Sequence, residues 1–188
     1  MRPRWPFDRP LLAGWLFGLA SAVALAVAVG ALFLSGIAYD TGADRPHPKA
    51  VAWAIHVTMI NSVGRRAEKD DAPPPVRDRA SLLSGAALYE RYCVACHGGP
   101  GQARAPWVAA MLPTPPYLLD ARGRWSHAEL RRLVRNGVKM TGMPAWGEVL
   151  SEREVGEVVS FVEIMPSLTP AAYSRIRRSV AAAQRAAK

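Results

Sequence analysis

Cysteine is scarce in this chain of 188 residues, which contains two cysteines and four histidines. A structural zinc site needs about four ligands, and His47, His56 and His127 lie in unlike segments, which argues against zinc. The sequence also lacks an internal repeat and any alternating pattern that would indicate a β-sheet. Its length suits one ordinary domain with additions and leaves no room for a multidomain enzyme.

Acidic side chains are outnumbered, but the formal net charge of +9 is spread unevenly. Residues 81–170 carry nine basic and eight acidic side chains, whereas residues 171–188 carry five basic and no acidic ones. A nucleic-acid-binding domain presents a basic patch or stripe on its folded body. Because the central segment is nearly neutral, we expect no nucleic-acid partner.

Charge is absent from one long stretch, residues 11–34. As a helix these 24 residues would be about 36 Å long, enough to cross a hydrocarbon core of roughly 30 Å. A cleaved signal peptide is the alternative, and Gly36 and Ala38 supply small residues for a cleavage point. Signal peptides, however, have apolar regions of only about 7–15 residues. The length therefore favours a retained transmembrane anchor.

Basic residues flank this stretch on one side only. Arg2, Arg4 and Arg9 precede it, and no Lys or Arg follows it before Arg45. Because basic residues concentrate on the cytoplasmic side of a span, residues 1–10 are predicted to be cytoplasmic. The rest of the chain would then lie outside the cytoplasm.

Residues 35–80 are predicted to connect the anchor to the main domain. Within them, residues 50–63 are apolar at helical spacing but too few to cross a bilayer. A helix at the membrane interface or against a partner fits this segment, and so does a helix buried against the main domain. Residues 65–80 are charged and contain three consecutive prolines, which favours an extended, semi-rigid linker.

Residues 81–168 form the predicted compact domain, which we expect to be all-α with long loops. Three helices are predicted near residues 82–96, 127–136 and 152–165. The second and third begin with capping-box signatures, in which a serine is followed three residues later by a glutamate: Ser126 with Glu129, and Ser151 with Glu154.

Residues 169–188 are predicted to form a basic C-terminal helix or tail. The pair Thr169 and Pro170 is a favourable helix start. The helix would bind anionic lipid or an acidic protein surface, or it would simply be solvated.

The two cysteines carry the chemistry. Cys93, Cys96 and His97 form the string Cys-Val-Ala-Cys-His, the attachment motif of a c-type haem. On a helix both thiols reach one edge of the porphyrin and form thioethers, and the imidazole of His97 lies beneath the iron. A thioredoxin-like pair would need a βαβ context, and a disulfide would not explain the histidine that follows. We therefore predict one covalently bound haem c.

A second axial ligand for haem iron is expected from a methionine on an opposite loop. Met143 lies between Gly142 and Pro144, which keep a loop open and deny it a helical path. Met140 is the alternative. Met111 also lies in a predicted loop, and the thioether of Met165 more naturally fills the core.

This combination resembles the class I cytochrome c family over residues 81–168. The resemblance rests on the motif at Cys93–His97 and on Gly-Met-Pro-Ala-Trp at residues 142–146. It implies three main helices around one haem, here preceded by a single transmembrane helix, as in tethered bacterial mono-haem cytochromes. It also implies that Gly85 and Tyr89 lie on an N-terminal helix that crosses a C-terminal helix near Phe161.

The family further implies that a loop proline carbonyl accepts the other N–H group of the proximal imidazole. Three prolines are candidates, of which the first is nearest in sequence: Pro100, Pro115 and Pro116. Neighbours of the haem propionates are also implied, although each candidate fits a surface or core position equally well: Arg122, Arg124, Trp125 and Trp146.

The predicted function is single-electron transfer by a membrane-anchored mono-haem c-type cytochrome rather than catalysis by an enzyme. Its redox partners would be a quinol-oxidising complex, a terminal oxidase, a dehydrogenase or a reaction centre, in a respiratory or photosynthetic membrane. The alternative is a fixed haem c subunit of a membrane-bound dehydrogenase or oxidase. A haem enzyme or gas sensor would need an open iron position, against which Met143 argues. The predicted location is the bacterial inner membrane, with the haem domain on the periplasmic side.

Overall fold

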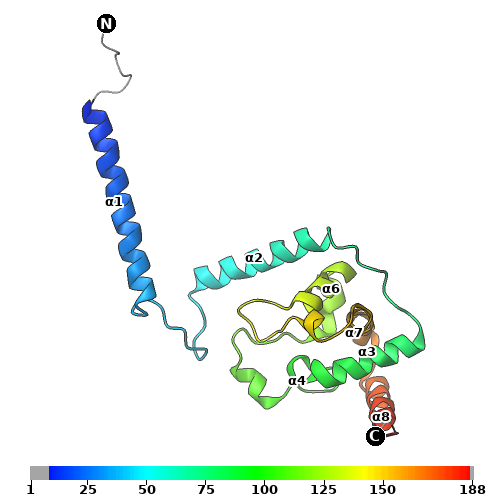
Figure 1. Ribbon diagram of the computed structural model, residues 1–188. Coiled ribbons are helices and arrows are strands. Elements are labelled where there is room, and N and C mark those ends of the chain that lie inside the picture. The colour runs from blue at the N-terminus through cyan, green and yellow to red at the C-terminus, as the bar shows by residue number, and fades with distance from the viewer. Residues whose placement is uncertain (1–8, 187–188) are drawn as a thin grey trace. The chain divides into compact units, whose positions relative to one another are not determined.

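The computed structural model describes residues 9–186, apart from the side chains of Arg9 and residues 120–122. Arg2 and Arg4, on which the predicted orientation depends, lie outside the described residues, and so does the side chain of Arg122. The described part is helical and contains no strand, which confirms the predicted all-α class (Figure 1). Its longer helices are α1 (Arg9–Leu34), α2 (Lys49–Ala67), α3 (Arg79–Tyr92), α6 (His127–Asn136), α7 (Glu152–Ile164) and α8 (Pro170–Ala186).

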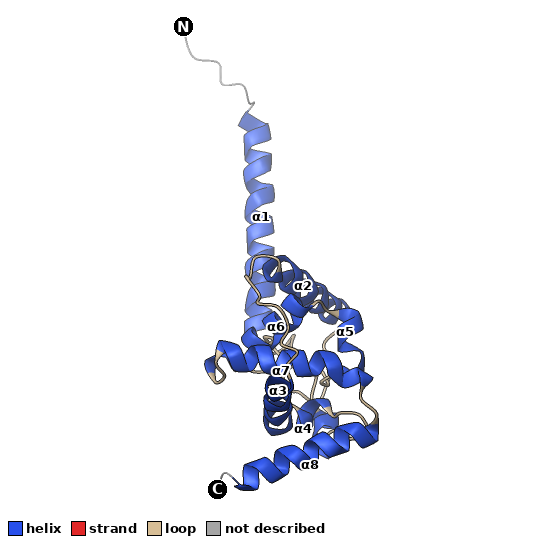
Figure 2. Ribbon diagram, turned by 90° about the vertical axis from the view of Figure 1, so that its right-hand side faces the viewer, coloured by secondary structure: helices blue, strands red, loops and turns tan. Residues whose placement is uncertain are grey.

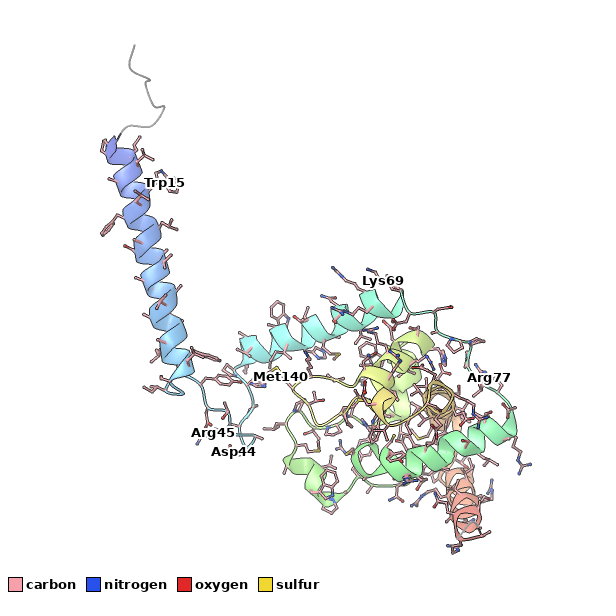
Figure 3. All side chains as sticks on the ribbon, viewed as in Figure 1. Trp15, Asp44, Arg45, Lys69, Arg77 and Met140 are labelled. Carbon is pink, nitrogen blue, oxygen red and sulfur yellow. The ribbon has the colours of Figure 1, made fainter. Side chains whose placement is uncertain are left out.

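Helix α1 is the predicted anchor. Its segment Pro10–Leu34 has a mean hydropathy of 2.4 and is long and apolar enough to cross a membrane. The side chain of Trp15 extends from it without covering by other residues (Figure 3). The chain divides into two compact units, one ending at Gly42 and the other beginning at Ala43, so α1 and the remaining helices belong to different units.

The core of the second unit is the crossing of α3 and α7. A Cβ atom on Gly85 would lie 2.1 Å from the carbonyl oxygen of Glu157 and 3.1 Å from Cβ of Phe161. Tyr89, one turn later on α3, is fully buried and its ring lies 5.7 Å from that of Phe161. The expected role of Gly85 at the crossing is therefore confirmed, since only glycine lets the two backbones approach this closely.

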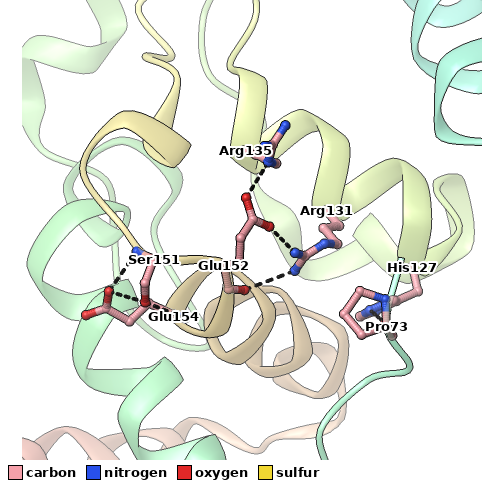
Figure 4. A network of polar contacts seen from close by, with 7 residues as sticks. All are labelled: Pro73, His127, Arg131, Arg135, Ser151, Glu152 and Glu154. Carbon is pink, nitrogen blue, oxygen red and sulfur yellow. Dashed lines mark hydrogen bonds and ion pairs between the residues drawn. The ribbon is translucent and has the colours of Figure 1, made fainter. Parts of the chain in front are cut away.

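Capping residues explain where the helices begin. Both predicted capping boxes form: the Ser126 N–H donates to Glu129 at 2.8 Å, and the Ser151 N–H donates to Glu154 at 2.8 Å, as Figure 4 shows for this second box. Helix α3 begins at residue 79, earlier than predicted, because the Asp78 carboxylate accepts the Ser81 N–H at 2.9 Å.

The segment from residue 49 to residue 78 is part of the second unit. Val63 and Ala67 are buried where the C-terminal half of α2 packs on α6, while Trp53 in the other half is 68% exposed. Residues 68–78, which we name the strap, run from α2 to α3, between the positions of Lys69 and Arg77 in Figure 3.

Two hydrogen bonds fasten the strap. The Val76 N–H donates to Oγ of Ser160 at 3.0 Å, and Nε2 of His127 lies 3.1 Å from the Pro73 carbonyl oxygen (Figure 4). The other ring nitrogen of His127 lies 3.2 Å from the Glu163 carboxylate. The strap is extended, as its prolines predict, but it is bonded to α6 and α7 and therefore does not behave as a free linker.

Ionic contacts join α6 to the start of α7. The Glu152 carboxylate bridges Arg131 and Arg135, with 2.6 Å to Nε of Arg135 (Figure 4). Arg132 pairs with Asp70 of the strap at 2.6 Å. These contacts hold the strap and the start of α7 to α6.

Candidate functional site

The residues of the Cys-Val-Ala-Cys-His string lie on a single helical turn, α4 (Val94–His97), directly after α3. Cys93 forms the junction, and its carbonyl oxygen accepts the N–H groups of Cys96 at 3.1 Å and His97 at 2.9 Å. Both cysteines are unpaired thiols. Burial raises the pKa of Cys93 to about 12, and the neighbouring Cys96 acts in the same direction.

The imidazole of His97 is oriented by a proline carbonyl. Its Nδ1 lies 2.8 Å from the carbonyl oxygen of Pro116, so Nδ1 carries the proton and Nε2 is left with its lone pair. Of the three candidate prolines, Pro116 is thus the one in contact. Burial lowers the pKa of His97, and the positive charge of Arg104 adds to this effect, while the Pro116 bond opposes it. The neutral imidazole is the form that ligates metals.

Arg104 supports the loop that carries this carbonyl. Its Nη1 donates to the carbonyl oxygen of Pro115, and its guanidinium lies 4.2 Å from the ring centre of Tyr117. Such a cation–π contact fixes both side chains at once. The Pro115–Pro116 backbone is therefore held on both sides of the His97 contact.

The loop after His97, residues 98–102, is held from two directions. The buried hydroxyl of Tyr89 donates to the Gly98 carbonyl oxygen at 2.7 Å. On the other side the ring of Tyr173, from α8, packs so closely that a Cβ atom on Gly99 would lie 2.7 Å from it. The loop thus lies between α3 and α8.

Helix α8 packs beside α3 (Figure 2), and its side chains form hydrogen bonds with α3 and with this loop. The Tyr173 hydroxyl donates to the Glu90 carboxylate at 2.6 Å, and Nε of Arg177 donates to the same carboxylate at 2.8 Å. A second nitrogen of Arg177 donates to Oε1 of Gln102 at 2.7 Å. Burial and the bond to Glu90 raise the pKa of Tyr173, which keeps its hydroxyl protonated. These contacts could not be predicted from the sequence, because no local pattern signals them.

Residues 137–146, which contain Met140 and Met143 and which we name the methionine loop, are held by hydrogen bonds within the loop. Gly137 adopts φ +63°, and a side chain there would meet the Pro144 backbone at 2.5 Å. The Val138 N–H donates to the Met143 carbonyl oxygen at 3.2 Å, and the Met143 N–H donates to Oγ1 of Thr141 at 3.1 Å. The position of Met143 is thereby fixed by its own backbone bonds.

The four candidate methionines have different surroundings. Met143 is half-buried, whereas Met140 is 65% exposed at the far end of the loop, where Figure 3 labels it. Met165 is completely buried in the core, as its sequence context suggested. The methyl group of Met111 lies 2.2 Å from where a Cβ of Gly142 would stand.

Aromatic side chains link the methionine loop to the cysteine motif. The ring of Trp146, which ends the loop region, lies 5.0 Å from that of Tyr92, the residue before Cys93. Trp125 and Trp146 are both partly buried and pack against the core. Residues about 50 apart in sequence are therefore brought together by the fold.

Comparison with known families agrees with this arrangement. The family described as cytochrome c oxidase, cbb3-type, subunit III matches residues 80–162. The matched part includes α3, the cysteine motif, α6, the methionine loop and most of α7, and it leaves α1, α2 and α8 outside. Residues 80–162 are a class I c-type cytochrome domain, a domain of electron transfer, in a chain that also carries an apolar helix able to span a membrane.

Proposed function

We propose that this protein is a membrane-anchored mono-haem c-type cytochrome that carries single electrons between redox partners at the membrane. Cys93 and Cys96 would attach the haem as thioethers, and His97 and Met143 would be its axial ligands. The observation that carries the proposal is the 2.8 Å contact from Nδ1 of His97 to Pro116. This contact leaves Nε2 of the motif histidine with the lone pair that a metal ligand needs.

The donor set suits this cofactor. A bound haem c supplies a one-electron iron couple whose potential depends on its axial ligands and on burial. The chain contributes two unpaired thiols on one helical turn and a neutral imidazole fixed by Pro116. It also contributes a loop that holds a half-buried thioether. With side chains of this chain in both axial positions, no position would remain for oxygen or peroxide, which favours electron transfer over oxygen chemistry.

The choice of Met143 over Met140 is tested by matched alanine variants of the full chain in detergent. We expect the reduced spectra of the wild type and Met140→Ala to be unchanged under carbon monoxide. Met143→Ala should bind carbon monoxide rapidly and show a lower midpoint potential, since loss of the thioether opens the iron. Carbon monoxide binding by Met140→Ala alone would transfer the ligand role to Met140. Binding by the wild type would refute the six-coordinate centre.

A fixed subunit of a membrane-bound dehydrogenase or oxidase is the second candidate. The uncovered N-terminal half of α2, with Trp53 exposed, favours it, because a freely diffusing carrier does not need such a surface. Purification in mild detergent separates the two proposals. A partner that co-purifies in fixed stoichiometry would exclude the free carrier and leave the subunit.

The proposed location is the bacterial inner membrane, with residues 1–10 in the cytoplasm and the haem domain in the periplasm. The basic residues before α1, and their absence after it until Arg45, support this orientation. Protease added to intact spheroplasts should cleave the haem domain. Protection of that domain would contradict the orientation and leave the electron-transfer proposal standing.

A further inference from the structure

Helix α8 lies outside the part of the chain that matches the cytochrome family, yet it is attached firmly to the site. Its inner face buries Tyr173 and Val180 and half-buries Ile176. Arg177 also faces inward, where Glu90 and Gln102 accept its hydrogen bonds. The helix is therefore a fixed part of the haem-attachment region.

The outer face of α8 carries three other arginines, Arg175, Arg178 and Arg185. All three are exposed, and they take part in no ion pair among the side chains that the structure describes. Spacings of three and seven residues place them on one side of the helix. Because α8 contains no acidic residue, every charge on the outer face is positive.

The surroundings of this cationic face favour a protein partner over lipid. A helix that lies in a membrane interface inserts its apolar face among the acyl chains. The large apolar residues of α8, Tyr173, Ile176 and Val180, already pack against the rest of its unit, so its exposed face has no large apolar side chain to insert. A partner on this face would lie about one helix diameter, roughly 10 Å, from the loop after His97, which Arg177 and Tyr173 contact from the inner face.

We propose that the outer face of α8 is a docking surface for an acidic patch on a redox protein partner. The inner face ties this surface to the haem-attachment loop, so docking and electron transfer would occur at the same region of the molecule. Complementary charge of this kind mainly raises association rates and sets orientation, and its effect falls with salt. The electron-transfer part of this inference rests on the proposed function.

The test uses the full chain in non-ionic detergent, with poly-L-glutamate as an acidic polypeptide probe at low salt. One variant replaces Arg175, Arg178 and Arg185 by glutamine. A matched control replaces the exposed Arg65, Arg66 and Arg77, so both variants lose the same net charge. We expect the α8 variant to bind about tenfold more weakly, as each exposed ion pair contributes a factor of about two to three. The control should change little.

Equal weakening in both variants would overturn the proposal, because attraction would then follow net charge alone. Phosphatidylcholine vesicles with and without phosphatidylglycerol provide the other arm. If the α8 variant loses affinity for the anionic vesicles and keeps its affinity for polyglutamate, the face binds lipid and the proposal is wrong. Polyglutamate binding requires no bound haem, so its failure and the failure of the ligand assignment are distinguishable. A single Arg178→Gln variant, expected to weaken binding about twofold to threefold, guards against a folding defect in the triple variant.

Discussion

Replacing Gly85 by alanine should destabilise the crossing of α3 and α7. The clash at the crossing should outweigh the stabilisation that alanine gives to an isolated helix. The added Cβ atom would stand 2.1 Å from the carbonyl oxygen of Glu157 and 2.6 Å from its carbonyl carbon. Non-bonded heavy atoms are at their optimal separation at about 3.5 Å. The obstacle is backbone, which no side-chain rotation removes, so the two helices would have to separate by about 1 Å or more.

The magnitude follows from two opposing contributions. Overpacking in a well-packed core costs about 1–3 kcal/mol, whereas alanine in place of glycine stabilises a helix interior by about 0.5–1 kcal/mol. The net loss in the free energy of unfolding should be about 1–2 kcal/mol. With a urea m-value of about 1–3 kcal/mol/M, the unfolding midpoint should fall by about 1 M.

The assay is urea unfolding of the full chain in detergent, followed by tryptophan fluorescence and by circular dichroism. Gly64→Ala on α2 is the matched control, because a Cβ there would meet only the Glu129 carboxylate at an ordinary 3.4 Å. The control should unfold at the same or a higher urea concentration. A Gly85→Ala midpoint at or above that of the wild type would refute the close crossing.

Two further predictions concern the strap and the helix caps. Ser160→Ala removes the acceptor of the Val76 N–H, so limited proteolysis should cut the strap severalfold faster. An unchanged cleavage rate would show that this hydrogen bond does not hold the strap in place. The hydroxyl group of Ser151, and after it the Ser151 N–H, lower the pKa of Glu154 below its ordinary value of 4.5. The stability that this carboxylate adds is therefore present above pH 4.5 and is lost as the pH falls through its lower folded pKa. In urea titrations Glu154→Gln should lose part of this acid dependence, and a profile identical to the wild type would contradict the cap contribution.

Local signals explain which parts of the fold could be predicted. Ser126 and Ser151 marked their helix starts because a cap involves residues only three positions apart. The apolar run of α1 and the cysteine motif are equally local. Asp78 is a comparable local signal, and as the N-cap it places the start of α3 at residue 79.

Contacts between distant residues could not be read in this way. Pro100, Pro115 and Pro116 were all possible partners of the imidazole, and only the folded loop brings the Pro116 carbonyl to His97. The attachment of α8 through Tyr173 and Glu90 joins residues 83 apart. Composition marked this helix as basic, but its division into an inner and an outer face depends on tertiary packing.

The fastened strap also determines how far the haem domain can search. If residues 35–78 were all free, about 44 residues could extend to roughly 150 Å from the end of α1. Because the second unit begins at Ala43, only residues 35–42 separate the anchor helix from it, and these residues reach about 30 Å at most. Since the accessible volume scales with the cube of this radius, the shorter tether concentrates the domain on the order of 100-fold near the membrane surface. A chain that had to reach a distant acceptor would gain from a longer tether, so this architecture suits partners embedded in the same membrane.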